Sequence, residues 1–182
     1  MKISPTTIPD VLLIEPAVYQ DERGFFLETF NARKYAQAGI PANLVQDNHS
    51  GSRAGVLRGL HYQILQPQGK LVSVVAGRIF DVAVDLRRSS PTFGRWVGTY
   101  LSAEERQQLW VPIGFAHGFY VVSPWAEVTY KVSDFYSPQG ERTLLWDDPT
   151  VNVRWPLVEG AAPLLSPKDA RGLPLDQVPL FD

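Results

Sequence analysis

The stretch Gly55-Val-Leu-Arg-Gly-Leu-His-Tyr-Gln63 carries one of the three histidines in the chain, on a run whose residues are typical of a β-strand. Histidine has an ordinary pKa of about 6.5, so its side chain can bind and release a proton close to neutral pH. A lone histidine on a strand is more often a hydrogen-bonded structural residue than a catalyst. We therefore expect His61 to carry chemistry only if the rest of the chain supplies groups that work with it.

The length of 182 residues fits one domain, residues 1–182. The 15 prolines and 14 glycines are spread between short apolar runs, which favours an all-β fold with few helices. From about residue 137 the chain becomes proline-rich but keeps supplying apolar groups, so we expect this C-terminal segment to be ordered and to wrap the body.

The charge and the missing residue types exclude several kinds of protein. The net charge is −2 and no run of lysines or arginines forms a basic patch, which argues against a nucleic acid partner. Without cysteine there is no disulfide scaffold, thiol nucleophile or thiolate metal site. No stretch has the pattern of a signal peptide or a membrane span, so we expect a cytoplasmic protein with no membrane partner.

Alternating and apolar runs predict the strands, and capping residues predict the short helices. A helix is expected from the cap Asn31 to Ala38, a helical turn at 102–105, and, after residues 42–48, a polar loop that ends near Gly55. The runs 70–76 and 79–86 flank Gly77-Arg78 and predict a β-hairpin. Strands are expected at 11–16, 24–30, 55–63, 70–76, 79–86, 96–101, 113–122 and 126–132.

The period of two assigns faces to individual side chains on these strands. Tyr130 shares its face with three apolar residues, so it should point toward the core. Phe26, Glu28 and Phe30 should lie together on one face of the strand 24–30. Asp81 is bracketed by apolar residues and needs a partner if it is buried, since an unpaired buried carboxylate is costly.

Two spaced patterns resemble the paired motifs of the cupin superfamily, whose fold is a jelly-roll barrel. They are Gly55-x5-His61-x-Gln63 and Pro112-x-Gly114-x2-His117. Metal-binding cupins have a second histidine where this chain has Gln63, followed by a glutamate that is missing here. Two histidines without that carboxylate are a poor site for a transition metal, so we expect no metal.

A longer series of motifs follows in order along the chain: Asp21-Glu-Arg-Gly-Phe-Phe-Leu-Glu28, Val45-Gln-Asp-Asn48, Gly55 to Gln63, Gln68-Gly-Lys70, Phe80-Asp-Val-Ala-Val-Asp85, Pro112-x-Gly-Phe-Ala-His-Gly-Phe119, Tyr130-Lys131 and Ser166-Pro-Lys-Asp169. Together they resemble the dTDP-4-dehydrorhamnose 3,5-epimerases over residues 8 to 170. The resemblance implies a single cupin-type jelly-roll domain. It also implies a homodimer in which the N-terminal strand crosses to the partner subunit.

The reaction implied by this resemblance converts dTDP-4-dehydro-6-deoxy-D-glucose to dTDP-4-dehydro-L-rhamnose by inverting C3 and C5. Both carbons are α to the ketone, so the carbanion left by proton loss delocalises onto O4. Inversion needs a base on one face of the sugar, an acid on the other, and a group that stabilises the enolate. No cofactor is required, and the chain has neither a dinucleotide fingerprint nor a P-loop.

The resemblance also implies roles for individual residues. The implied catalytic residues are His61 as the base, Asp169 as its partner, Tyr130 as the acid and Lys70 at the enolate oxygen. The implied substrate-binding residues are Arg23 and Arg58 for the diphosphate, Glu28, Gln46 and Asn48 for polar groups of the nucleotide, Tyr136 for stacking on thymine, and His117, Glu141 and Lys168 for further contacts.

One spacing conflicts with a regular strand, because Arg58 and His61 are an odd number of residues apart and would face opposite sides. Either Gly59 allows a β-bulge that brings both to one pocket, or Arg58 serves a neighbouring subunit, as Arg23 and Glu28 could.

Four alternatives to the double epimerase stay open. They are a mono-epimerase, a 3,4-ketoisomerase, a metal-dependent cupin oxygenase and a non-catalytic sugar-nucleotide-binding protein.

Overall fold

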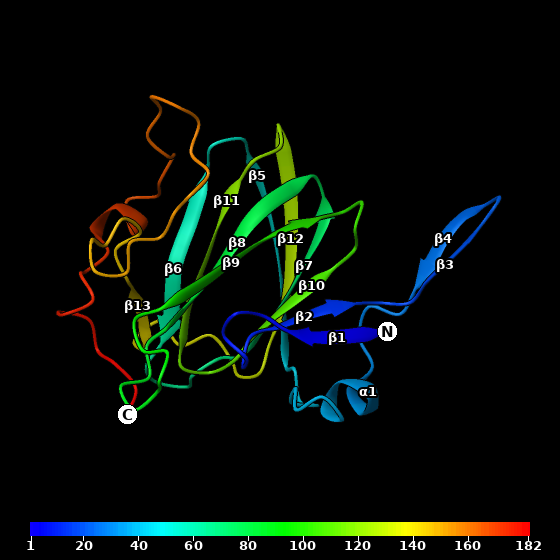
Figure 1. The fold of residues 1–182 in the computed structure, drawn as a ribbon, viewed down its shortest axis with the longest axis horizontal. Helices are drawn as coiled ribbons and strands as arrows, with labels where there is room; N and C mark the ends of the chain where they lie inside the picture. The colour runs from blue at the N-terminus through cyan, green and yellow to red at the C-terminus, as the bar shows by residue number, and fades with distance from the viewer.

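The computed structural model describes residues 1–182, and two antiparallel β-sheets face each other in it (Figure 1). The six-stranded sheet has the order β1 (Lys2–Pro5), β2 (Leu12–Glu15), β10 (Gln108–Val111), β7 (Lys70–Ala76), β12 (Trp125–Val132) and β5 (Gln46–Arg53). The five-stranded sheet has the order β13 (Glu141–Thr143), β6 (Leu57–Gln63), β11 (Phe115–Val121), β8 (Arg78–Asp85) and β9 (Trp96–Ser102). This arrangement confirms the predicted all-β jelly roll.

Apolar side chains from the inner faces of both sheets fill most of the space between them. Val72 and Val128 from the six-stranded sheet pack with Ala83 and Phe115 from the five-stranded sheet in one buried cluster. On the edge strand β5 the inward positions are instead polar: Gln46, Asn48, Ser50 and Ser52. The apolar core therefore gives way to a polar cavity near β5 and β6.

Two further clusters cover outer faces of the sheets. The chain after β13 runs beside the five-stranded sheet (Figure 1), where Val151 and Leu175 pack on Leu60 and Val82. The single α-helix, α1 (Ala32–Ala36), places Tyr35 in a smaller cluster with residues of β2, β7 and β10. No helix is long and apolar enough to cross a membrane.

The hairpin predicted at 70–86 is wrong, because β7 and β8 lie in different sheets. β7 pairs with β10 and β12, whereas β8 pairs with β9 and β11. The turn residue Gly77 has φ +71°, and a Cβ there would lie 1.9 Å from the carbonyl oxygen of Trp125. Both strands are apolar enough to be central in their own sheets, so a sharp turn between them crosses from one sheet to the other.

The N-terminal third also departs from the sequence predictions. The loop expected after residues 42–48 contains most of β5, and the strand expected at 24–30 ends at Leu27 as β4 (Gly24–Leu27). β4 pairs with β3 (Val18–Asp21), which was not predicted, in a hairpin that projects away from both sheets (Figure 1). Glu28 lies beyond this strand, so it does not share a strand face with Phe26 as expected.

The capping predictions have a mixed outcome. Asn31 caps α1 as expected by accepting from the backbone N–H groups of Arg33 and Lys34, but the helix ends at Ala36. Ser102 accepts a hydrogen bond from the backbone N–H of Glu105 at 3.1 Å. The backbone N–H of Arg106 donates to the carbonyl of Ser102 at 3.0 Å, so the predicted helical turn is present, but it is a single turn that ends before β10.

Candidate active site

A β-bulge at Gly59 brings Arg58 and His61 to the same cavity. His61 pairs with His117 and Arg58 pairs with Phe119, so β6 has one residue more than β11 over this interval. Gly59 has φ +127°, and a Cβ there would lie 2.5 Å from the Cα of Gly118. Both conditions require glycine. Of the two alternatives that the odd spacing left open, the β-bulge is therefore the one that the structure shows.

The cavity between the sheets has two adjoining parts, with volumes of about 350 and 250 Å³. Five residues line both parts: His61, Lys70, Tyr130, Glu141 and Lys168. The larger part is completed mainly by Gln46, Asn48, Gln63, Gln68 and Tyr136, and the smaller part by Ser50, Arg58, His117, Phe119, Ser166 and Asp169. Eleven of the thirteen sequence-predicted site residues thus lie around one cavity.

His61 and Asp169 form a hydrogen-bonded pair although they are far apart in sequence. The Nε2–Oδ1 distance is 2.5 Å, and the other Asp169 oxygen accepts from the Ser166 hydroxyl at 2.7 Å. Burial opposes ionisation of Asp169, but the hydrogen bonds from His61 and Ser166 outweigh it and lower the pKa of this carboxyl. An ionised Asp169 accepts a hydrogen bond from the Nε2–H of neutral His61, which leaves the lone pair of the imidazole on Nδ1.

Burial also lowers the pKa of His61, even though Asp169 acts in the opposite direction. The positive charges of Lys168 and Lys70 add to the lowering. A histidine with a lowered pKa is neutral at pH 7, which is the form that can accept a proton.

Lys70 is buried beside His61, not solvated as is usual for a lysine at the start of a strand. Its side-chain Nζ donates to the backbone carbonyl of His61 at 3.2 Å. Burial lowers the pKa of Lys70 to about 8, and the nearby carboxylates of Asp81 and Glu141 limit the lowering. Lys70 is therefore mostly a cation at pH 7, in a place where its charge is poorly solvated.

Tyr130 reaches the cavity from β12, on the sheet opposite to His61. It is partly buried and packs against the apolar core, which confirms its predicted inward direction. Burial raises the pKa of its hydroxyl, with a partly offsetting effect from Arg58. The phenol is consequently protonated at neutral pH and available as a proton donor.

His117 and Asp81 form a second buried pair in the wall of the cavity. The His117 Nε2 lies 2.9 and 3.0 Å from the two oxygens of Asp81, which supplies the partner that a buried Asp81 needs.

Gln63 holds two loops: its side-chain amide nitrogen donates to the carbonyls of Gln66 and Phe135, and its side-chain oxygen accepts from the backbone N–H of Ser137. No group of three or more His, Cys, Asp or Glu side chains has the arrangement of a metal site. We keep the metal-free site as a prediction.

Polar contacts organise the larger part of the cavity. The Gln46 amide donates to Asn48 at 2.9 Å, and its oxygen accepts from the backbone N–H of Tyr136 at 3.0 Å. Glu141 accepts from the Tyr136 hydroxyl at 2.9 Å and from Lys168 at 2.7 Å. Tyr136 is half exposed and lines this part of the cavity, so part of its ring is accessible to a ligand.

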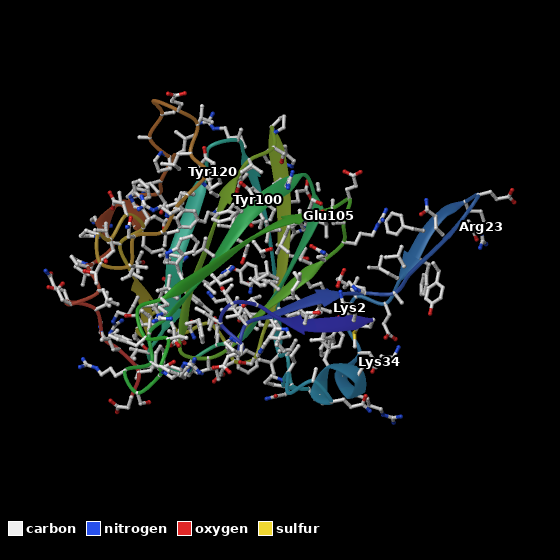
Figure 2. All side chains as sticks on the ribbon, viewed as in Figure 1. Lys2, Arg23, Lys34, Tyr100, Glu105 and Tyr120 are labelled. Atoms are coloured by element: carbon white, nitrogen blue, oxygen red, sulfur yellow. The ribbon has the colours of Figure 1, made fainter.

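Arg23 and Glu28 are the two predicted site residues that the chain does not bring to its own cavity. Arg23 lies at the tip of the β3–β4 hairpin, far from both sheets (Figure 2), and pairs with Asp21. Glu28 pairs with Lys34 at 2.7 Å on the surface beside α1.

Sequence reasoning missed three hydroxyl groups near the site. Ser52 accepts from the Nε of Arg58 at 2.9 Å, Ser166 holds Asp169, and Ser50 lines the cavity. The two serines of β5 were missed because the segment after Asn48 was interpreted as a polar loop. Its inward positions alternate with outward ones, and this period of two is the signal that identifies both serines.

Comparisons with known proteins show which family the chain belongs to. A family model described as dTDP-4-dehydrorhamnose 3,5-epimerase matches residues 5–177. The dTDP-4-dehydrorhamnose 3,5-epimerase of Pseudomonas aeruginosa is 58% identical over 173 residues, covering 94% of each chain.

Two solved structures are especially informative. A dTDP-6-deoxy-D-glucose-3,5-epimerase from Legionella pneumophila, in complex with dTDP-4-keto-L-rhamnose, has a TM-score of 0.95 at 52% identity and covers 99% of this chain and 97% of its own. A 3'-monoepimerase from Streptomyces bikiniensis, in complex with dTDP-quinovose, has a TM-score of 0.88 at 33% identity, covering 95% and 87%. The family match, the high identity and the shared fold together show that the chain belongs to the dTDP-4-dehydrorhamnose 3,5-epimerase family.

Proposed function

We propose that this protein converts dTDP-4-dehydro-6-deoxy-D-glucose to dTDP-4-dehydro-L-rhamnose by inverting C3 and C5. The observation that carries the proposal is the arrangement of three groups around one cavity. His61 lies on one sheet and is hydrogen-bonded to Asp169, Tyr130 lies on the other sheet, and the buried Lys70 lies beside His61. An acid and a base on opposite walls are what an inversion requires.

In the proposed mechanism, neutral His61 removes the proton from C3 or C5. Asp169 stabilises the imidazolium that forms, and the Lys70 ammonium stabilises the negative charge on O4. Tyr130 then protonates the same carbon from the opposite face. After one inversion His61 holds the abstracted proton and Tyr130 is a phenolate, so both must exchange protons with water before the second inversion.

The remaining cavity residues suit a nucleoside diphosphate. The guanidinium of Arg58 and the ammonium of Lys168 would contact the phosphates. Tyr136 would stack on the thymine, while Gln46 and Asn48 would bind polar groups of the nucleotide. His117 and Glu141 would make further contacts.

The proposed substrate carries the negative charge of a diphosphate and does not cross a bilayer unaided. We therefore propose that the protein acts in the cytoplasm.

We also propose a homodimer in which the β3–β4 hairpin reaches the partner subunit. Tyr19, Phe25 and Phe26 on this hairpin are more than half exposed, which is unfavourable for an isolated chain. Crossing to a partner would cover these rings and bring Arg23 and Glu28 to the partner's cavity.

Mixed dimers test this exchange. If Arg23 serves the partner's cavity, a dimer of one Arg23→Ala chain and one His61→Asn chain has one site with both defects and one site with none. Mixing the two weakly active variants should therefore restore activity. Activity that stays at the average of the two variants would show that Arg23 serves its own chain or no site.

Product analysis tests the proposed reaction. Incubation of the protein with dTDP-4-dehydro-6-deoxy-D-glucose should give the L-rhamno product, identified by the proton couplings of the hexose in NMR. A product inverted at one carbon would indicate a mono-epimerase like the Streptomyces neighbour, a 3-keto product a ketoisomerase, and no product a binding protein. A stoichiometric transition metal whose removal abolishes turnover would contradict the metal-free mechanism.

A further inference from the structure

Ser50 has a buried hydroxyl group that no protein group uses. Its Oγ is shielded from solvent and has no hydrogen-bond partner. Buried hydroxyls almost always have a partner. The polar neighbours on the same face of β5 are engaged, because Asn48 accepts from Gln46 and Ser52 accepts from Arg58, each at 2.9 Å. Ser50 is thus the unused hydroxyl in a row of inward-facing polar side chains.

The position of Ser50 places it beside the reacting part of the proposed substrate. Asn48 is directly opposite Tyr130 in the pairing of β5 with β12, and Ser50 is opposite Val128, so Ser50 is the diagonal neighbour of Tyr130. Ser50 lines the same part of the cavity as His61 and Tyr130. A hexose ring held between His61 and Tyr130 would therefore lie next to Ser50.

The chemistry of the substrate limits what Ser50 can bind there. O1 of the hexose carries the diphosphate, C4 is the ketone and C6 is a methyl group, so hydroxyl groups remain at C2 and C3. The cations Arg58 and Lys168 suit the phosphates, and Lys70 suits O4. A serine hydroxyl both donates and accepts, as a sugar hydroxyl does, and rotation about its one side-chain bond can turn it toward the cavity.

We propose that Ser50 binds a ring hydroxyl of the hexose, at C2 or C3, and helps to hold the ring between His61 and Tyr130. This inference rests on the proposed function and adds a sugar-specific contact to it. Ser50 then distinguishes a nucleotide that carries the hexose from one that does not. Ser52, two residues further along the same face, instead holds Arg58 and affects the diphosphate.

Titration calorimetry with dTDP and dTDP-glucose tests the assignment. dTDP-glucose keeps the hydroxyls at C2 and C3 but lacks the ketone, so it cannot be epimerised. Ser50→Ala should weaken dTDP-glucose binding about 3- to 10-fold and dTDP binding less than about 2-fold, the range expected for one hydrogen bond. Ser52→Ala is the matched control and should weaken both ligands by similar factors.

The stability of the two variants adds a readout that does not depend on ligand. Removing an unpaired hydroxyl should leave Ser50→Ala at least as resistant to urea as the wild type, whereas Ser52→Ala loses a hydrogen bond and should unfold at lower urea. Equal weakening of dTDP and dTDP-glucose in Ser50→Ala, or no change in either, would overturn the assignment. Failure of the wild type to bind dTDP at all would overturn the proposed function and this inference with it.

Discussion

Replacing Lys70 with methionine should stabilise the fold at pH 7 while it abolishes epimerisation. Lys70 is 8% exposed, and burial lowers its pKa from 10.5 to about 8. At about 1.36 kcal/mol for each tenfold change in the protonation equilibrium, this lowering corresponds to about 3 kcal/mol. At pH 7 Lys70 is charged in the folded and the unfolded chain, so the folded state carries the whole cost of burying the charge.

The pH dependence of this cost has a definite sign. As the pH rises through about 8, the folded chain releases the Lys70 proton while the unfolded chain keeps it until about 10.5. The wild type therefore gains stability over this range, and Lys70→Met does not. The variant also loses the hydrogen bond to the carbonyl of His61, worth about 1 kcal/mol. The net gain expected for Lys70→Met is about 2 kcal/mol at pH 7 and close to zero at pH 10.

Urea unfolding at equal protein concentrations measures these differences. At pH 7 the gain should raise the melting temperature by about 4–8 °C as well. Lys2→Met is the control, because Lys2 is exposed and its ion pair with Glu15 contributes at most about 1 kcal/mol. A Lys70→Met variant that is less stable than the wild type at pH 7, or a difference that does not change with pH, would refute the reasoning.

Three more predictions concern the reaction and the bulge. On a plot of kcat/KM against pH, the acid limb should have its midpoint below 6.5, because burial lowers the pKa of His61. The alkaline limb should have its midpoint at about 8, from Lys70, and should disappear in Lys70→Arg. An alkaline limb that is unchanged in Lys70→Arg would show that Lys70 does not stabilise the enolate. Gly59→Ala should destabilise the fold by about 2–4 kcal/mol, measured by urea unfolding. Gly24→Ala is the control and should cost clearly less, because Gly24 has a similar φ of +124° but nothing lies within 4 Å of an added Cβ. Equal losses of stability in the two variants would show that only the φ angle matters. Tyr130→Phe should slow product formation more than loss of the C3 and C5 protons, because abstraction does not need the acid, and wild-type rates for both steps would contradict its role.

The sequence predicted the elements whose side chains alternate strongly and missed those whose role depends on distant partners. β6 and β12 were predicted because apolar residues mark their buried faces, and the bulge at Gly59 was one of two alternatives raised by the odd spacing of Arg58 and His61. β5 was missed because its inward face is polar, and a polar face lines a cavity only when another sheet covers it.

Local sequence patterns also could not predict which strands pair within each sheet. The short turn at Gly77 has the sequence of a hairpin, and only the packing of β7 and β8 into separate sheets decides otherwise. The contact of Asp169 with His61 spans 108 residues, so no periodicity could predict it, and it entered through family resemblance alone. Arg23 and Glu28 lie away from the cavity of their own chain, and the proposed exchange of the hairpin involves a second chain, which one sequence does not describe.

Solvent exchange at the two carbons tests the central claim most directly. The protein is incubated in deuterated water with dTDP-4-dehydro-6-deoxy-D-glucose, and the C3 and C5 protons are followed by NMR in the wild type and in His61→Asn. A double epimerase that resets through water should replace both protons with deuterium, and His61→Asn, still folded by circular dichroism, should replace neither. Exchange at one carbon, no exchange in the wild type, or full exchange in His61→Asn would contradict the account.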